Sequence, residues 1–554
     1  MSTSEIPRVE TMSADFVPVL CDSRWDRFEA FLGRLSERLN PILVKEARQA
    51  LRSRQFTVTF LLLLVAGWIW SIFGLAAYGP GVYYAAAGPT MFFGYFLILA
   101  FPLLIVAPYS IFHSLSSERQ DRTYELVSIT SLNARHIVSG KLGGISLQML
   151  VYLSAIFPCL AFTYLLRGLD IFTILFVVLY TCGESLGLAV LGLLLASSTA
   201  PRQRQIVMSV GFAIVLVFTF FFASTIAFQM VMFDFTRLDS EDFWIGQLAL
   251  LSLYANAFAI GFLCARSNLM SVCQNRSTDV RIALVVAQLS GLAWMAWAQL
   301  RWGSDFVYGF LFVCTFFWYF AGMLLTGESG LLSPRVKRDL PQSTLGRVFL
   351  TWFVPGPGTG YMFVIANMLA ATIMVSLPYA SIRSLFEIAT VRVLSTGPAA
   401  RAVRPELVST AVIATSYLMI YLGIGKLLMS VIARFSEVRL ATRVLVHLLL
   451  AMLGAGVPWV IQMTIPELRT EHYTLLQITN PFWTVVELCN KGLPFQMPVL
   501  IAVLPIAALV VWSLNVPSLL AELKQVRIPK PERVEEDDKA SAPPTVPQRT
   551  SPWG

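Results

Sequence analysis

The residues best suited to chemistry form a charged segment, Ser116–Lys141, between two long apolar runs. Glu118 and Arg122 are four positions apart, and so are Asp121 and Glu125. A helix would therefore place the two members of each pair one turn apart. Because only 13% of the chain is charged, a group this dense needs a physical reason. We expect it to make charge-assisted contacts with a second protein, and the alternative is an ordinary solvated loop.

A second candidate is an ionisable residue inside an apolar run. Glu184 follows Gly183 and precedes Ser185 in a stretch apolar enough to cross a bilayer. A charged side chain at that depth costs about 2.5–3.5 kcal/mol on insertion scales. Its small neighbours would let it face another helix rather than lipid. Glu184 therefore takes part either in gating or substrate contact, or in structural hydrogen bonding.

Several kinds of catalytic and cofactor chemistry lack their residues. The four histidines form no ligand pair at helical spacing, so neither a haem nor a zinc site is predicted. The seven cysteines contain no Cys-x-x-Cys pair. The segment Gly423–Lys426 reads Gly-x-Gly-Lys but lacks the upstream glycine and the Ser or Thr of a phosphate-binding loop. We therefore predict no catalytic residue, no metal and no cofactor bound by this chain.

Composition predicts a membrane protein. Hydrophobic residues make up 56% of the chain, and about twelve apolar runs reach the roughly 20 residues that span a bilayer core. The predicted fold is all-α, a polytopic transmembrane helix bundle, with two six-helix halves or an accidental even count. The first run begins too late for a signal peptide. Placing both termini in the cytoplasm concentrates basic residues in the cytoplasmic gaps, which explains the formal charge of +8 without nucleic acid.

The predicted organisation has five segments. They are a disordered N-terminus (1–25), amphipathic interfacial helices (26–56), a first six-span half (57–264) with the cytoplasmic loop 114–144, a second half (265–519) with the loop 327–359, and a disordered cytoplasmic tail (520–554). We expect a break at Asn40-Pro41, because proline cannot continue a helix from its N-terminal side. The basic residues of the interfacial segment should lie near the anionic headgroups of the bilayer; they are Lys45, Arg48, Arg52 and Arg54.

The charged segment also resembles a known signature. The stretch Glu118–Leu126, followed by Thr130-Ser131-Leu132 and Gly140-Lys141, is similar to the coupling-helix motif of type-2 ABC transporter permeases. The stretch Asn40–Arg52 resembles the connecting helix before the first span of that family. The likeness is clearest over roughly the first 200 residues. Arg122 and Ser131 depart from it, because the family has glycine and proline there.

The resemblance implies a permease, the membrane-spanning subunit of an ATP-driven transporter, and not an enzyme. A separate ABC ATPase would use the ATP and dock on the loop after the second span. The coupling residues would be Glu118, Arg119, Arg122, Thr123 and Glu125. One chain could supply both halves, or chains would pair as a homodimer or heterodimer in a plasma membrane, such as the bacterial inner membrane. The alternatives are a twelve-span secondary carrier and a non-transporting scaffold or sensor, and scarce intramembrane charge weighs against the carrier.

Overall fold

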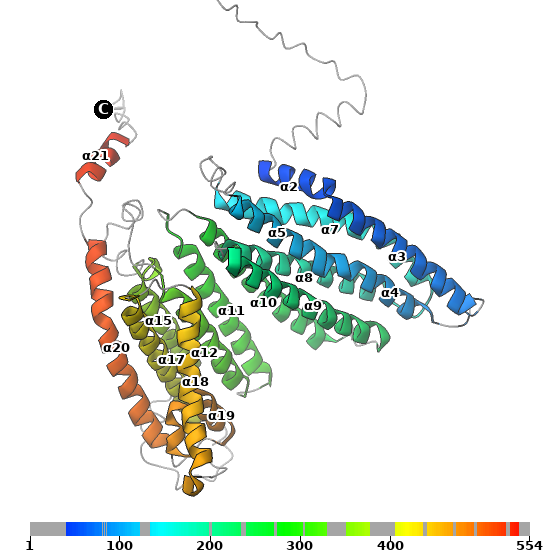
Figure 1. The fold of residues 1–554 in the computed structure, drawn as a ribbon. Helices are drawn as coiled ribbons and strands as arrows, with labels where there is room; N and C mark the ends of the chain where they lie inside the picture. The colour runs from blue at the N-terminus through cyan, green and yellow to red at the C-terminus, as the bar shows by residue number, and fades with distance from the viewer. Residues whose placement is uncertain are drawn as a thin grey trace, which may run out of the picture. The chain divides into compact units, whose positions relative to one another are not determined.

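The fold was obtained as a computed structural model (Figure 1). It describes residues 40–79, 81, 84, 86–121, 133–198, 202–233, 240–270, 274–302, 305–328, 351–376, 405–435, 440–468, 473–491, 496–527 and 532–541. This part of the chain is helical and contains no strand. Twelve of its helices are long and apolar enough to cross a membrane. The prediction of an all-α transmembrane bundle is therefore confirmed.

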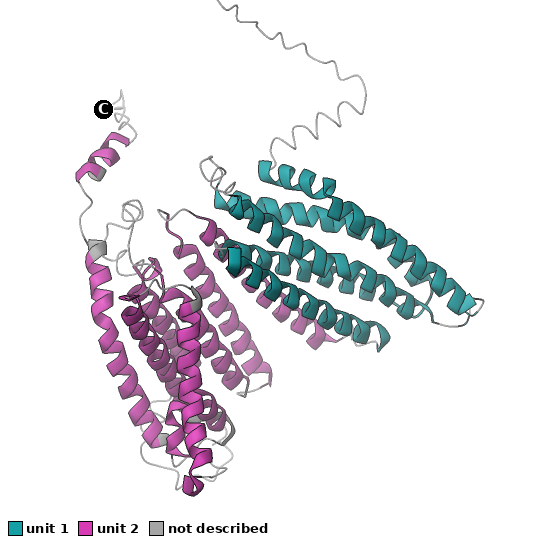
Figure 2. Cartoon of the chain, in the orientation of Figure 1, with its two compact units in different colours: residues 1–235 teal, residues 236–554 magenta. Residues whose placement is uncertain are grey.

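The chain divides into two compact units, Met1–Phe235 and Thr236–Gly554 (Figure 2). This division differs from the predicted boundary at 264/265, because helix α10 (Glu241–Leu269) groups with unit 2. There the Trp294 indole N–H donates to the Ser252 hydroxyl over 2.6 Å, which joins α10 to α11 (Thr278–Trp302). The organisation into two six-span halves stays a prediction.

Unit 1 is a bundle of antiparallel helices around one deeply buried element. Its helices are α2 (Pro41–Arg52), α3 (Arg54–Tyr78), α4 (Gly88–Phe101), the π-helix η2 (Pro102–Val106), α5 (Ala107–Gln120), α7 (Ala134–Leu165), α8 (Ile171–Ser198) and α9 (Arg202–Met232). The continuous stretch α4–η2–α5 forms the core, where Leu103 and Leu115 are fully buried. Because η2 widens the helix, the Leu103 carbonyl accepts a hydrogen bond from the Ser185 hydroxyl of α8.

The start of α2 follows from local chemistry. The Asn40 side chain accepts from the Ile42 amide over 3.1 Å, and Pro41 takes the first helical position, where its missing N–H is not needed. A helix therefore starts at Pro41, at the predicted break, while the predicted helical residues before Asn40 lie outside the described residues. Ser53 ends α2 and caps α3 through the Phe56 amide. Residues 1–39, including the predicted disordered N-terminus, lie outside the described residues.

Helix α2 packs closely against the first turns of α7, where glycines line the contact. A Cβ added at Gly140 would lie 2.8 Å from the Ile42 Cβ, and one at Gly144 would lie 3.0 Å from the Glu46 Cβ. Side chains at these positions would push the two helices apart. The glycines therefore bring the charged residues of α2 within reach of α7 and of the end of α5.

Unit 2 is built around α17, the most buried of the twelve apolar helices. Besides α10 and α11, its elements are α12 (Asp305–Leu325), η3 (Thr351–Phe353), α15 (Pro357–Ser376), α17 (Pro405–Ile432), α18 (Leu440–Thr464), η6 (Pro466–Leu468), η7 (Leu475–Thr479), α19 (Pro481–Lys491), α20 (Met497–Arg527) and α21 (Glu532–Ser541). Trp318, Tyr361 and Leu422 pack in its core. The tail predicted as disordered from residue 520 is wrong over two stretches, because α20 continues to Arg527 and 532–541 form α21.

Candidate functional site

Four charged residues from three helices of unit 1 meet at the end of α5. The Glu118 carboxylate lies 3.3 Å from the Lys45 ammonium of α2 and 3.0 Å from the Lys141 ammonium of α7. Lys141 also pairs with Glu46 of α2 at 2.9 Å. We call Lys45, Glu46, Glu118 and Lys141 the charged cluster. The predicted loop 114–144 is shorter in the structure, because α5 continues to Gln120 and α7 already begins at Ala134. The cluster joins these two helices to α2, the helix that precedes the first span.

Lys141 is the centre of this cluster. An ammonium group has three N–H donors, and that of Lys141 has three acceptors at 2.9–3.0 Å, namely Glu46, Glu118 and the Ser114 hydroxyl. Its side chain is only 1% exposed, whereas that of Lys45 is 58% exposed. A buried cation is tolerated when it is paired and hydrogen-bonded in this way. The cluster therefore has a buried inner lysine and a solvated outer one.

The residues next to Glu118 connect α5 to two further helices. The Arg119 guanidinium donates to the carbonyls of Ala196, over 3.3 Å, and Ser197 in the last turn of α8. A cation suits the negative end of a helix. The Gln120 amide donates to the Gln205 side chain in the first turn of α9. Three consecutive side chains at the end of α5 thus contact α2 and α7, α8, and α9.

The structure describes only part of the predicted coupling set. Glu118 and Arg119 are bound within unit 1 as given above. Arg122, Thr123 and Glu125 lie outside the described residues, in the gap 122–132. Contact of any of the five with an ATPase stays a prediction. Of the predicted interfacial cations, Lys45 joins the charged cluster, and Arg48, Arg52 and Arg54 are exposed on α2 and at the start of α3.

Glu184, the predicted intramembrane residue, is half-buried in α8. Among the described residues, no hydrogen bond or ion pair reaches its carboxylate, although the next residue, Ser185, is buried and bonded to Leu103. A Cβ added at Gly183 would meet nothing within 4 Å. The structure thus leaves the half-buried Glu184 without a structural partner within the described part of unit 1.

Unit 2 contains a buried ion pair that the sequence did not single out. Arg281 of α11 is completely buried, and its guanidinium donates to the Glu328 carboxylate and to the Trp352 carbonyl, both over 2.6 Å. The Ser277 hydroxyl donates to the same carboxylate over 2.8 Å. Glu328 and Trp352 flank the gap 329–350, so the loop 327–359 is anchored at both ends. The charged stretch 332–341 inside it lies outside the described residues.

A further carboxylate closes the same end of unit 2. Glu522 of α20 accepts from the Gly358 and Thr359 amides, over 2.7 and 2.9 Å, at the start of α15. A carboxylate is favoured at this positive end of a helix. Lys426 of α17 also contacts α20, where it donates to the Ser518 hydroxyl over 2.5 Å. The centroid of the Tyr361 ring lies 5.4 Å from its ammonium. The Lys426 side chain is buried.

Sequence signals for these residues exist but are weak. Lys141 ends the Gly-Lys pair of the charged segment, and the glycines before it mark the close approach of α2. The glycines and prolines from Pro355 to Gly360 mark a tight helix start that needs an acceptor. Within the described residues, no group of three or more His, Cys, Asp or Glu side chains could hold a metal ion. No protein-family model, no curated protein and no solved structure matches the chain.

Proposed function

We propose that the chain is the membrane permease subunit of an ATP-driven ABC transporter, coupled to a separate ATPase through the loop 114–144. One observation carries the proposal. The last turn of α5, directly before the predicted docking segment, contacts α2, α7, α8 and α9 through Glu118, Arg119 and Gln120. A protein bound to the segment 122–132 would act on a point from which four further helices can be moved.

The charged cluster would keep the two sides of the loop together during such a movement. Glu118 is the last-turn residue of α5, and Lys141 lies in the second turn of α7. Their ion pair at 3.0 Å links the helix that enters the loop to the helix that leaves it. Force on the loop would then move α5 and α7 as one body rather than separate them. Coupling of this kind needs an element with two arrangements that both sites influence.

The charge distribution of unit 1 supports a cytoplasmic position for the cluster. Many cations of the described part gather at the cluster's end of the unit, where they include Arg48, Arg52, Arg54, Arg135, Arg202 and Arg204. Arg167 lies at the opposite end, between α7 and α8. By the positive-inside rule, this distribution supports our proposal that the cluster and the N-terminus face the cytoplasm. With twelve spans the C-terminus would face the same side, and we propose the bacterial inner membrane as the host membrane. Reporter fusions at the C-terminus test this orientation: an active cytoplasmic fluorescent protein is expected, and an active external phosphatase would contradict it.

Co-purification tests the partner. The tagged chain, purified from its native membrane in mild detergent, should bring down a soluble ABC ATPase that mass spectrometry identifies. Arg122→Ala/Glu125→Ala should lose it, because both changes remove charge-assisted contacts. The matched control is Arg533→Ala/Glu536→Ala, which removes the same two residue types from the exposed helix α21. Full retention of the ATPase by the first variant would overturn the docking segment.

Glu118 needs a separate experiment, because its carboxylate is already bound inside unit 1. If it acts only through the charged cluster, Glu118→Gln should retain the ATPase but lower the apparent melting temperature of the purified chain. Loss of the ATPase at an unchanged melting temperature would instead assign Glu118 a direct contact. The two readouts separate a positioning role from a docking role.

A secondary carrier is the second candidate, and Glu184 is the observation that favours it. A half-buried carboxylate with no partner in the described part of the unit is the type of residue that ion-coupled carriers use. Metabolite profiles of cells that express the wild type or Glu184→Gln test this candidate. A difference between the two that disappears when the proton gradient is collapsed, with ATP kept high, would favour the carrier over the ATP-driven permease.

A further inference from the structure

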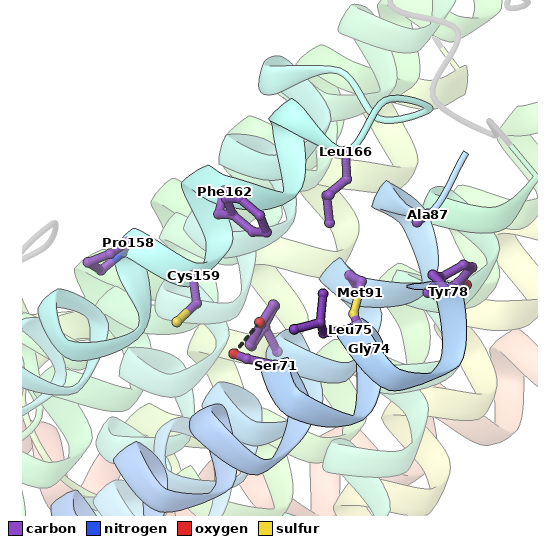
Figure 3. Close-up of a pocket in the computed structure, with 11 residues that line it drawn as sticks. Ser71, Gly74, Leu75, Tyr78, Ala87, Met91, Pro158, Cys159, Phe162 and Leu166 are labelled. Atoms are coloured by element: carbon purple, nitrogen blue, oxygen red, sulfur yellow. Dashed lines mark hydrogen bonds between the residues drawn. The ribbon is translucent and has the colours of Figure 1, made fainter. Parts of the chain in front are cut away.

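Unit 1 contains a pocket at the end opposite to the charged cluster. It has a volume of about 330 Å³ and lies between the last turns of α3, the start of α4 and the last turns of α7 (Figure 3). Leu75 of α3 and Met91 of α4 lie on one side, and Phe162 and Leu166 of α7 lie on the other. Pro158 and Cys159 of α7 extend this wall. The size is within the range of small-molecule sites.

The lining selects an uncharged, mostly hydrocarbon ligand. No charged side chain lines the pocket. Its main polar feature is the Ser71 hydroxyl, which is hydrogen-bonded to the Tyr95 hydroxyl over 2.6 Å, so both groups are already satisfied (Figure 3). The buried Tyr95 ring and the Met91 side chain form an apolar floor. A charged headgroup inside this pocket would lose its hydration without gaining a partner.

The surface around the pocket is apolar, as expected of a surface that faces lipid. Leu75 and Phe162, which line it, are exposed, and so are the neighbouring apolar residues Ile72 and Leu165. All four lie on helices that are long and apolar enough to span a membrane. Acyl chains are therefore the abundant molecules at the opening, and an unfilled apolar space would forfeit their dispersion contacts.

A cation lies at the end of the pocket. Arg167 directly follows the lining residue Leu166, and its carbonyl accepts from the Gly88 amide over 3.1 Å, next to the lining residue Ala87. This bond fixes the turn, in which Arg167 has a φ of 62° and Gly168 a φ of 83°. The Arg167 side chain is exposed, and among the described residues no ion pair reaches it. Nearby Asp170 accepts from the Phe172 amide over 3.2 Å.

We propose that this pocket binds an anionic glycerophospholipid, with one acyl chain between α3, α4 and α7 and the headgroup phosphate at Arg167. An apolar pocket whose lining residue Leu166 is followed by an exposed arginine matches a molecule with a hydrocarbon chain and a terminal phosphate. Arginine suits such a phosphate because its planar fork can donate two parallel hydrogen bonds. The site does not depend on the proposed coupling to an ATPase.

Photolabelling in vesicles tests the site. The purified full chain is placed in phosphatidylcholine vesicles that contain a trace of phosphatidylglycerol or phosphatidylcholine with the same diazirine-bearing acyl chain. Mass spectrometry then compares labelling of residues 71–78 and 158–166 with labelling of the exposed face of α9. We expect enrichment at the pocket and an about fivefold preference for phosphatidylglycerol, as one basic residue at an anionic headgroup provides. Arg167→Gln should abolish the preference, and Arg301→Gln, on an exposed helix end of unit 2, should leave it.

A second pair of variants tests the pocket itself. Cys159→Phe fills part of the space and should reduce labelling by both lipids, whereas Cys182→Phe adds the same side chain in α8 outside the pocket and should not. Labelling spread evenly over α3, α7 and α9 would overturn the site. Equal labelling by the two lipids would overturn the anionic assignment. A cross-link between two chains at residues 71–78, with lipid label excluded, would overturn it in favour of a second copy.

Discussion

Each unit holds the ends of a loop with ion pairs, but the partners of the carboxylate differ between the two units. In unit 1, the loop that follows α5 is flanked by the charged cluster, in which the Glu118 carboxylate lies between two lysines and the outer one, Lys45, is solvated. In unit 2, the loop that follows α12 begins at Glu328, whose main cationic partner is the fully buried Arg281. Both arrangements tie the ends of a loop to neighbouring helices. They differ in that Glu118 has a second, solvated cationic partner, Lys45, beside its buried one.

This difference predicts different mechanical roles. Because Lys45 is solvated, water can compensate when the Lys45–Glu118 pair opens, so that rearrangement costs little. Opening the Arg281–Glu328 pair would leave a buried guanidinium without its carboxylate, which is expensive. Unit 1 therefore has an end that can change its contacts, whereas the corresponding end of unit 2 is locked. An adjustable end beside the proposed docking segment is what coupling requires.

The largest effect should follow loss of the carboxylate that pairs with the buried Arg281. Glu328→Ala leaves Arg281 with the Trp352 carbonyl as its remaining close partner, and we expect a loss of about 3–5 kcal/mol in the free energy of unfolding. Heating of the purified protein, followed by size-exclusion chromatography, would show a large fall in apparent melting temperature. The double variant Arg281→Met/Glu328→Met should recover much of it, since it removes the charge as well. A small effect of Glu328→Ala would contradict the locked end of unit 2.

Loss of the inner lysine of unit 1 should have the next largest effect. Lys141→Met removes the donor shared by Glu46, Glu118 and Ser114. Hydrogen bonds to charged groups contribute about 1.5–3 kcal/mol, and Lys45 and water limit the loss at Glu118. The same melting measurement applies, with Lys539→Met on the exposed helix α21 as control. A loss as large as that of Glu328→Ala would remove the distinction between the two ends.

A smaller effect is expected at the helix cap of unit 2. Glu522→Gln keeps one acceptor oxygen for the Gly358 and Thr359 amides but removes the charge at the start of α15. We expect a loss of about 1 kcal/mol, with Glu536→Gln on α21 as control. The change in melting temperature should shrink at high salt if the charge matters. An unchanged melting temperature would mean that the amide alone caps the helix.

Much of the fold could be predicted from the sequence, because membrane spans depend on local composition. The first half predicted to begin at residue 57 starts within α3, Arg54–Tyr78, and Asn40-Pro41 marks the start of α2. The membership of α10 in unit 2 could not be predicted, because it depends on contacts such as Trp294 to Ser252 rather than on composition. Likewise, α20 extends past residue 520 where Glu522 binds the start of α15.

The candidate site could be predicted only in part. The charged segment stood out because charge is scarce, but its partners did not. Lys141 and Arg281 lie in the first turns of apolar helices. A single cation there usually indicates only the orientation of a span in the membrane. Their burial depends on residues from other helices, namely Glu46 and Glu328. The burial of Lys426 could not be predicted for the same reason, because its partner Ser518 is far away in sequence.

The smallest effect should come from the outer lysine, and it tests the comparison most directly. Lys45→Ala removes one of the two ammonium groups from Glu118, but the Lys45 side chain is 58% exposed and Lys141 remains at 3.0 Å. An exposed ion pair contributes at most about 1 kcal/mol, so the melting temperature should barely change. If Lys45→Ala destabilised the chain as much as Lys141→Met, burial would not be what separates the two lysines. The adjustable end of unit 1 would then have no physical basis, because the Lys45–Glu118 pair would be as costly to open as the pairs of Lys141.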